Sequence, residues 1–195
     1  MSMIKIENLT FSYPSHSDPI FQNVSFQIDT DWKLGFVGRN GRGKTTFLKL
    51  LLGAYEYSGR ITSSVTFDYF PYPVPDKCRF TGEVLREVCP DAQEWELVRE
   101  LSCLGMDAQI LWQPFDTLSG GEQTRVLLAA LFLNPGHFLL IDEPTNHLDI
   151  VSKEILEQAL THYTGTVLFV SHDRYFINTT ATRILDLSEQ NLTNY

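Results

Sequence analysis

The stretch that decides the fold is Gly38-Arg39-Asn40-Gly41-Arg42-Gly43-Lys44-Thr45. Its spacing is that of a phosphate-binding loop, in which backbone N–H groups and a helix N-terminus converge on phosphate oxygens. A short apolar run, 34–37, precedes it and an apolar, helix-like segment, 45–52, follows it, which favours this function over a flexible glycine turn. Lys44 would reach the β and γ phosphates, and Thr45 would give its hydroxyl oxygen to Mg²⁺.

A second chemical feature lies at 138–143, where four apolar residues lead into two carboxylates. If 138–141 is a strand of a parallel sheet, Asp142 lies at its carboxyl edge beside the phosphate loop. Asp142 then suits Mg²⁺ through a water molecule, and Glu143 would polarise an attacking water as general base. The alternative is a helix N-terminal acid or a solvated strand end.

Outward from these two features, strand patterns alternate with helix patterns, which predicts a mostly parallel sheet covered on both faces. A proline-rich stretch, 71–75, forbids regular structure. The patterns predict two antiparallel strands at 3–9 and 21–28, and further strands at 34–37, 138–141, 166–170 and 184–187. A two-residue alternation also runs through 59–69. Helices are predicted at 45–52, within 81–106, and at 122–133, 151–160 and 174–179.

The composition describes an ordinary folded chain. Of the 195 residues, 43% are apolar and 20% charged, which excludes disorder, collagen and coiled coil as global descriptions. The sequence has no apolar stretch of membrane-spanning length and no signal-peptide pattern, so we expect a cytoplasmic location. A net charge of −9 opposes non-specific binding to nucleic acid, and three cysteines without C-x-x-C spacing predict no metal or redox site.

Leu118-Ser119-Gly120-Gly121-Glu122 is similar to the signature motif of the ABC ATPase superfamily, and the resemblance covers nearly the whole chain. From the residues alone, the two glycines open the helix at 122–133, as a second anion site or as a plain helix N-terminus. The resemblance implies an α/β P-loop NTPase fold with a mostly parallel core sheet, an N-terminal antiparallel β subdomain and a small helical subdomain. It also implies ATP hydrolysis by two domains paired head to tail, in which Ser119 and Gly121 of one cap the γ phosphate held by the other.

Further site residues are carried over by the same resemblance. Tyr13 resembles the aromatic that stacks on adenine, His172 the histidine that contacts the γ phosphate, and Asp149 the aspartate that communicates across the dimer. Their alternatives are a strand-end tyrosine, a structural histidine and a helix cap. The expected ATP contacts are Tyr13, Gly38, Arg39, Asn40, Gly41, Arg42, Gly43, Lys44, Thr45, Thr46, Ser119, Gly120, Gly121 and Asp149; the Mg²⁺ ligands are Thr45 and Asp142; the catalytic residues are Glu143 and His172.

The resemblance also sets the expected domain organisation. Residues 1–72 and 134–195 are expected to form the core with the antiparallel β subdomain, and 73–133 the helical subdomain with its signature helix. A family member would continue past residue 195 into a second ATPase domain. The expected partner is therefore a second ABC domain, on the same longer chain or as a homodimer mate.

The details of three motifs resemble the ABC-F group, whose members are soluble, have two ATPase domains on one chain and act on ribosomes. Those motifs are 118–125, 142–149 and 171–176. Transporter ATPases usually carry a glutamine after the strand that here ends before Pro71, and this chain has Tyr72 there, a poor Mg²⁺ ligand. The Phe70-Pro71-Tyr72 variant further resembles ABC-F proteins that protect ribosomes from lincosamide, streptogramin A and pleuromutilin antibiotics.

Two other functions remain open at this point. One is the ATP-binding subunit of a membrane transporter, which the general motifs allow and Tyr72 opposes. The other is a nucleotide-gated binding module that scarcely hydrolyses ATP, which Glu143 and His172 oppose. About 45 residues separate Tyr72 from Leu118, which leaves room for the helical subdomain but not for the long two-helix arm of other ABC-F members. We expect a ribosome partner and no direct membrane contact.

Overall fold

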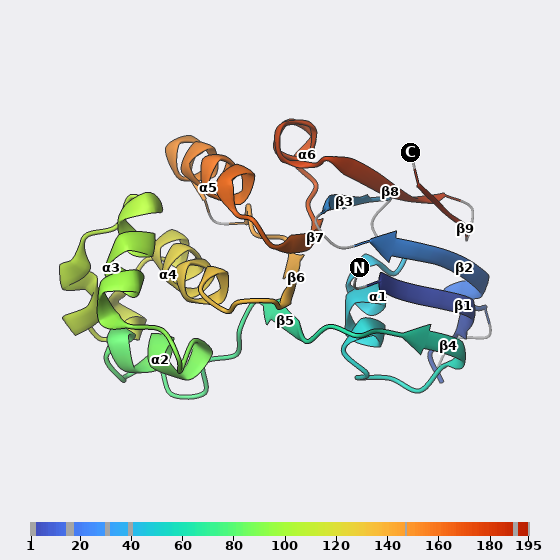
Figure 1. Ribbon diagram of the computed structural model, residues 1–195, viewed down its shortest axis with the longest axis horizontal. Coiled ribbons are helices and arrows are strands. Elements are labelled where there is room, and N and C mark those ends of the chain that lie inside the picture. The colour runs from blue at the N-terminus through green and yellow to red at the C-terminus, as the bar shows by residue number, and fades with distance from the viewer. Residues whose placement is uncertain are drawn as a thin grey trace. The chain divides into compact units, whose positions relative to one another are not determined.

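The computed structural model describes residues 3–14, 18–29, 32–38, 41–146, 148–188 and 191–194 (Figure 1). The described residues fall into two compact units. The sheet unit comprises 1–68, 136–142 and 165–195, and the helical unit comprises 69–135 and 143–164. Within the described residues, no helix has both the length and the apolar character needed to cross a membrane.

A six-stranded sheet forms the centre of the sheet unit, and its strand order is β5-β6-β7-β3-β8-β9. β6, β7, β3 and β8 are paired in parallel, and β9 pairs antiparallel with β8. Every residue of β7 is buried, as expected of a central parallel strand. Helix α1 packs on β6 and α6 on β3. The bounds are β3 (Lys33–Val37), β5 (Phe67–Phe70), β6 (Phe138–Asp142), β7 (Thr166–Val170), β8 (Arg183–Ser188), β9 (Asn191–Asn194), α1 (Lys44–Leu51) and α6 (Arg174–Thr180).

A second, antiparallel sheet of three strands completes the sheet unit, in the order β2-β1-β4. The strands are β1 (Met3–Phe11), β2 (Phe21–Asp29) and β4 (Ser58–Thr62). Phe47 of α1 joins this sheet to the central one, because its fully buried ring packs against Phe21 and Phe26 of β2 and against Phe36 of β3, with ring centroids 5.4–5.9 Å apart. The apolar side of α1 therefore holds the two sheets together.

The two-residue alternation over 59–69 belongs to two strands. The segment divides into β4, which joins the antiparallel sheet, and β5, which joins the central one. Between them, the Ser63 hydroxyl bonds both the N–H and the carbonyl of Val65 and closes a turn. The sequence analysis also missed β9, whose polar sequence has no strand pattern. The other strands and the helices were predicted to within a few residues.

The helical unit is built from α2 (Thr81–Val88), α3 (Glu94–Cys103), two 3₁₀ turns, α4 (Gly120–Phe132) and α5 (Ile150–His162). The sequence analysis expected 134–195 to belong to the core, whereas 143–164 group with the helical unit. The physical reason is packing: the Ile155 side chain lies against Gly105 after α3, and Tyr163 stacks on Phe132 of α4 at 5.0 Å. Helix α5 thus completes the core of this unit.

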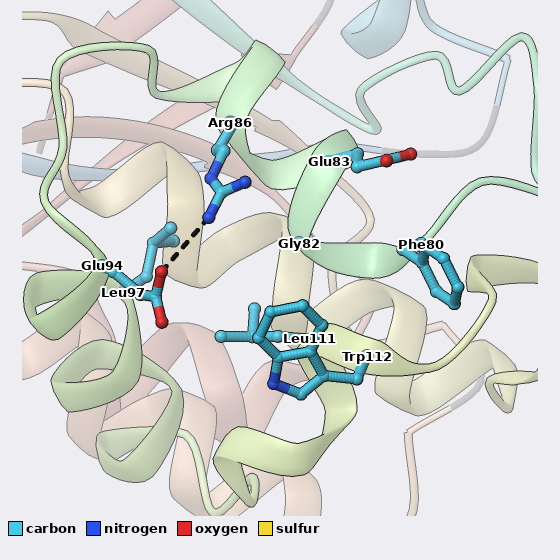
Figure 2. A pocket seen from close by; sticks show the side chains of 8 residues that line it. All are labelled: Phe80, Gly82, Glu83, Arg86, Glu94, Leu97, Leu111 and Trp112. Carbon is cyan, nitrogen blue, oxygen red and sulfur yellow. Dashed lines mark hydrogen bonds and ion pairs between the residues drawn. The ribbon is translucent and has the colours of Figure 1, made fainter.

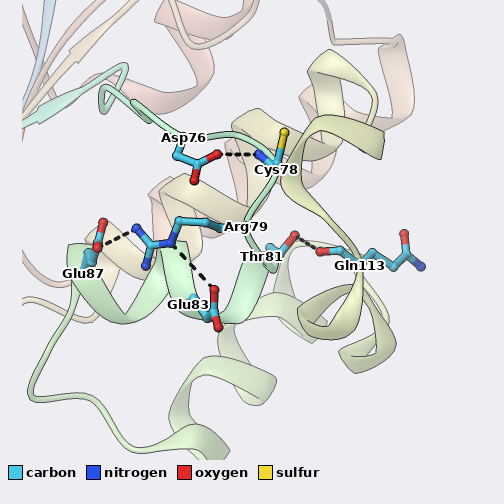
Figure 3. Close-up of polar contacts among 7 residues, drawn as sticks. All are labelled: Asp76, Cys78, Arg79, Thr81, Glu83, Glu87 and Gln113. Atoms are coloured by element: carbon cyan, nitrogen blue, oxygen red, sulfur yellow. Dashed lines mark hydrogen bonds and ion pairs between the residues drawn. The ribbon is translucent and has the colours of Figure 1, made fainter.

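The segment before α2 is held by polar contacts (Figure 3). Arg79 pairs with Glu87 at 2.6 Å and with Glu83 at 3.7 Å. The buried Thr81 donates both its N–H and its hydroxyl to the carbonyl of Gln113, at 2.9 and 2.8 Å. These bonds tie the start of α2 to the 3₁₀ turn 108–112, so the proline-rich stretch leads into a fixed helix.

Replacing Phe47 by alanine tests the packing of α1 between the two sheets. We expect Phe47→Ala to lower the free energy of unfolding by about 3–5 kcal/mol, because it removes a buried ring from among three others and leaves a cavity. Urea denaturation measures the change. Leu52→Ala, at the partly exposed end of the same helix, is the matched control and should cost less than about 1 kcal/mol. Equal losses for the two variants would contradict the role given to Phe47.

Candidate active site

The predicted phosphate-binding loop, 38–45, lies where the sequence indicated, between β3 and α1. Gly43 is the N-cap of α1 and has a left-handed φ of +92°. A Cβ at this position would lie 2.4 Å from Cγ2 of Ile20, so no other residue fits without displacing its neighbours. Gly43 thereby brings the backbone into the first turn of α1 with its N–H groups open at the helix N-terminus. Arg39 and Asn40, predicted to contact ATP, lie outside the described residues.

Lys44 is buried, and its Nζ donates a hydrogen bond of 2.9 Å to the carbonyl of Gly38. The side chain therefore turns back over the loop toward the end of β3, the place from which a lysine reaches phosphate oxygens. The next residue, Thr45, is exposed on the first turn. Thr46 is buried, and its hydroxyl is 2.9 Å from the hydroxyl of Tyr13, which follows β1. The structure thus brings Tyr13 to the phosphate loop.

Strand register brings the other predicted groups of the sheet unit to the same edge. Phe36 of β3 pairs with Val170 of β7, and Val170 pairs with Asp142 of β6. Asp142 is therefore level with Phe36, which lies two positions before the loop. His172 follows β7, the strand that lies between β6 and β3. Adjacent strands are about 4.8 Å apart, so these groups share one short edge. This arrangement was predicted from the apolar strand patterns and is now seen in the pairing.

Glu143 follows Asp142 with a backbone φ of +53°. A glutamate in the left-handed region costs on the order of 1 kcal/mol, and such residues are concentrated at functional sites. Glu143 as a residue is half-buried and its Oε2 atom is buried, and the next two residues, Pro144 and Thr145, are buried. The backbone therefore leaves the extended conformation at Glu143, directly after β6.

The loop that carries His172 is shaped by its neighbours. The N–H of Asp173 donates to the Ser171 hydroxyl at 3.1 Å, and the Asp173 carboxylate accepts from the N–H groups of Tyr175 and Phe176 at the start of α6. His172 itself is exposed. Exposure disfavours the alternative of a buried structural histidine and leaves the imidazole accessible at the sheet edge.

Ser119 begins the signature helix α4 through a reciprocal capping box. Its hydroxyl accepts from the N–H of Glu122 at 3.3 Å, and a Glu122 carboxylate oxygen accepts from the N–H and the hydroxyl of Ser119, at 2.8 and 2.7 Å. These hydrogen bonds lower the pKa of Glu122. Gln123 donates to the carbonyls of Phe115 and Leu118 and fixes the preceding turn. The helix-cap interpretation of Ser119 is therefore correct, and Gly120 and Gly121 form the first turn.

Asp149 is the N-cap of α5, as the alternative interpretation stated. Its carboxylate accepts a 2.7 Å hydrogen bond from the N–H of Ser152. Hydrogen bonding from Ser152 lowers the pKa of Asp149, so the group is an anion at neutral pH. A role across a dimer stays a prediction, since the cap accounts for the observed geometry.

The donor set fits Mg²⁺. Thr45 and Asp142 offer hard oxygen atoms, which Mg²⁺ prefers, and Mg²⁺ needs few protein ligands when substrate phosphates and water supply the rest. Within the described ranges, no group of three or more His, Cys, Asp or Glu residues is placed to hold a metal ion without such help. The residues present therefore suit a cation that arrives with a nucleotide.

The predicted residues are divided between the two units. The sheet unit holds Tyr13, Gly38, Gly41, Arg42, Gly43, Lys44, Thr45, Thr46, Asp142 and His172, and the helical unit holds Ser119, Gly120, Gly121, Glu143 and Asp149. Sequence reasoning missed Glu122 and Gln123, although Ser119 and Glu122 have the S-x-x-E spacing of a capping box.

The helical unit also has a small pocket of about 90 Å³ at Phe80 and Trp112 (Figure 2). Leu97 and Leu111 line it, and Arg86 and Glu94 form an ion pair of 3.2 Å beside it. None of the residues predicted to bind ATP lines this pocket. This pocket is therefore separate from the predicted nucleotide-binding residues.

The phosphate loop between strand and helix, with an acidic strand end on the same edge, defines a P-loop nucleoside triphosphatase domain. The family described as "ABC transporter" matches residues 21–146. The chain belongs to this family, whose domains bind and hydrolyse ATP. It is therefore an ATPase domain, as the signature motif predicted.

Two relatives and one solved structure illustrate the similarity. ABC transporter F family member 5 of Arabidopsis thaliana is 34% identical over 201 residues, which cover 100% of this chain and 29% of that protein. Ribosome protection protein VmlR of Bacillus subtilis (strain 168) is 33% identical over 192 residues, 97% of this chain and 35% of that protein. A bacterial Atm1-family ABC exporter with ATP bound has a TM-score of 0.83 at 20% identity, covering 98% of this chain and 38% of that one, a likeness of fold alone. The chain spans about a third of the length of these two relatives.

Glu122→Gln tests the charge of the capping box. The folded chain lowers the pKa of Glu122, so its carboxylate contributes stability that is present above the unfolded pKa and lost as pH falls through the folded pKa. We expect the variant to lose about 0.5 kcal/mol of unfolding free energy at pH 7, a small value because solvent screens the group. The loss should vanish in acid. Urea denaturation at several pH values measures it, and a loss that persists in acid would refute the electrostatic explanation.

Proposed function

We propose that this chain is an ABC-F-type ATPase domain whose ATP-driven, head-to-tail closure on a second ABC domain acts on the ribosome. Two features support the branch. One is the similarity to an F family member and to a ribosome protection protein along nearly the whole chain. The other is Tyr72, which stands where transporter ATPases usually have a glutamine.

The single observation that carries the nucleotide site is the register that makes Phe36, Val170 and Asp142 level. This register supports the proposal, because the segments that carry the 38–45 loop, His172 and Asp142 then end at the same edge of the sheet. The N–H groups at the start of α1 and the Lys44 ammonium would bind the phosphates, which are anions. Tyr13 would stack on adenine. Mg²⁺, when bound at Thr45 and Asp142, neutralises charge on the β and γ phosphates.

Glu143 and His172 would carry out the hydrolytic step. The Glu143 carboxylate would accept a proton from the attacking water, and the His172 imidazole would contact the γ phosphate and orient the attack. The left-handed φ of Glu143 supports this role, because strained backbone conformations of this kind are concentrated at functional sites. His172 is exposed at the end of the adjacent strand, where a γ phosphate could meet it.

The residues at the start of α4 and α5 would serve the nucleotide of the partner domain. Ser119, Gly120 and Gly121 would cap its γ phosphate, because N–H groups and the helix dipole attract anions. Asp149 would signal across the interface. The partner would be a second ABC domain on the same longer chain or in a homodimer mate, in keeping with the third of its relatives' length that this chain spans.

Closure would be the output that reaches the ribosome from the cytoplasm, without direct membrane contact. Protection against lincosamide, streptogramin A or pleuromutilin antibiotics is the most specific form of the proposal, and the ribosome-protecting relative supports it. The competing function is an ATP-binding transporter subunit, which the fold shared with an ABC exporter favours. Its target would be a membrane protein in place of the ribosome.

Lys44→Ala tests the phosphate loop. We expect MgATP to bind about 10- to 100-fold more weakly, because a charge-assisted contact to the phosphates is lost. Isothermal titration calorimetry measures the dissociation constant. Lys49→Ala, in the last turn of the same helix, is the matched control and should bind as the unaltered chain does. Unchanged affinity in Lys44→Ala would refute the loop's role.

Glu143→Gln tests the general base and the target together. We expect ATP binding to be retained and turnover to fall by about 10²–10⁴-fold, because glutamine keeps the size of the side chain and cannot take a proton. Glu154→Gln, exposed on α5, should keep full turnover. Full activity of Glu143→Gln would show that another group is the base.

The same variant identifies the target, because a chain that closes without hydrolysing ATP stays on its partner. A lysate containing the full-length gene product with Glu143→Gln is fractionated with ATP on a sucrose gradient and by membrane sedimentation. Co-migration with ribosomes is the expected result and leads to antibiotic-protection assays. Co-sedimentation with membranes would overturn the ribosome proposal in favour of the transporter subunit.

A further inference from the structure

A cavity of about 550 Å³ lies in the helical unit, lined by the C-terminal parts of α3, α4 and α5 (Figure 1). Sites for small molecules usually have volumes of about 300–1,000 Å³, so this cavity is large enough for such a ligand. The pocket at Phe80 and Trp112, with about 90 Å³, is not. None of the residues predicted to bind ATP lines the larger cavity, which is therefore separate from the nucleotide site.

Two stacked rings form the aromatic part of the cavity wall. Phe132 is the last residue of α4 and Tyr163 follows α5, and their rings have centroids 5.0 Å apart and planes inclined by 29°. Phe132 is buried, whereas Tyr163 is only half-buried. The N–H of Tyr163 donates to the carbonyl of Ala159 at 2.9 Å, which fixes the backbone that carries the ring. The accessible part of a ring held in this way offers an aromatic ligand a stacked or edge-on contact.

Two side chains of opposite charge line the same cavity from consecutive positions of α3, Arg99 and Glu100. Neither forms an ion pair with any residue in the described part of the chain. The Arg99 guanidinium lies over the ring of Trp95, with Cζ 5.4 Å from the ring centroid. This contact orients the guanidinium without neutralising its charge. Both charges thus remain available to opposite charges on a ligand.

The last turn of α5 contributes further polar groups to the cavity. The Nδ1 atom of His162 is 2.7 Å from the carbonyl of Gln158. A carbonyl only accepts, so Nδ1 carries the hydrogen and Nε2 is left for other contacts. Carbonyl groups at a helix C-terminus carry partial negative charge, which favours a cation. The end of α5 and Glu100 therefore both favour a positively charged group on the ligand, and Arg99 favours a negatively charged one.

We propose that this cavity binds a small aromatic zwitterion, a molecule with a planar ring, an ammonium group and a carboxylate. The ring packs on Tyr163, the carboxylate pairs with Arg99, and the ammonium pairs with Glu100. An anionic ligand without the ammonium is repelled by Glu100, and a cationic ligand without the carboxylate is repelled by Arg99. This site goes beyond the proposed ATPase function and does not depend on it.

Four probes separate the parts of such a ligand. L-Tryptophan has the ring and both charges, indole-3-propionate lacks the ammonium, tryptamine lacks the carboxylate, and L-alanine lacks the ring. Dissociation constants are measured by NMR titration of this chain. We expect tryptophan to bind most tightly, the two singly charged indoles about two- to fivefold more weakly, and alanine at least about tenfold more weakly.

Two cysteines of the chain report where the probe binds. Cys103 lines the cavity and is exposed, whereas Cys78 is exposed outside it. Tryptophan at ten times its dissociation constant should slow the alkylation of Cys103 by iodoacetamide about three- to tenfold, because the bound probe covers the thiol in most molecules. The rate at Cys78 should stay unchanged. Mass spectrometry of the cysteine-containing peptides measures both rates in one sample.

Two charge-removing variants test the assigned contacts. Arg99→Gln should weaken tryptophan binding about two- to fivefold and should not weaken tryptamine binding, because tryptamine has no carboxylate. Glu100→Gln should weaken tryptophan binding to the same extent and should not weaken the binding of indole-3-propionate. Neither variant breaks an ion pair within the described residues, and a thermal denaturation curve confirms that each is folded. Arg86→Gln, at an arginine of the same unit that does not line the cavity, is the matched control and should bind all probes as the unaltered chain does.

Three results would overturn the site: no binding of tryptophan up to about 10 mM, equal affinities for the three indole probes, or an alkylation rate of Cys103 that tryptophan leaves unchanged. A loss in Arg99→Gln or Glu100→Gln that is equal for all three indole probes would overturn the charge pairing, because it would show a general change of the cavity.

Discussion

The parallel pairing of β6, β7 and β3 is the constraint on which the rest of the structure depends. Parallel strands end at one edge, and the pairing of Phe36 with Val170 and of Val170 with Asp142 makes the three strands end level. Each strand is followed by polar residues, so a fixed register converts three distant sequence motifs into one cluster. A slip of one residue in one strand would turn each of its side chains to the opposite face of the sheet and shift its polar end out of line with the other two.

The sequence predicted most of this fold because its signals are local. The all-buried strand 166–170 was predicted to the residue, since Thr166 and the four apolar residues after it form a short run typical of a buried strand. The alternation over 59–69 did not reveal the division into two strands, because its period is that of a strand throughout while its pairing partners lie in two sheets. Pairing is a long-range property, and Ser63, which closes the turn between the strands, is common in strands and turns alike.

The residues of the candidate site also differ in whether local sequence or long-range contacts reveal them. The phosphate-binding loop and the acidic strand end are each formed by consecutive residues, so Lys44 and Asp142 could be identified from the sequence alone. The caps at Ser119 and Asp149 were weighed as alternatives and are present. The contact between the hydroxyls of Tyr13 and Thr46, 2.9 Å apart, could not be predicted, because only the folded backbone brings these two distant residues together.

At Glu143 the left-handed backbone lowers the stability of the fold, while the side chain of the same residue has the proposed catalytic role. Glycine tolerates that conformation without strain and asparagine tolerates it better than glutamate does, so either would relax the turn at the end of β6. Neither carries a carboxylate. A laboratory selection for heat resistance alone would therefore favour the loss of this glutamate; if Glu143 is the general base, as proposed, only a selection that also demands turnover would retain it.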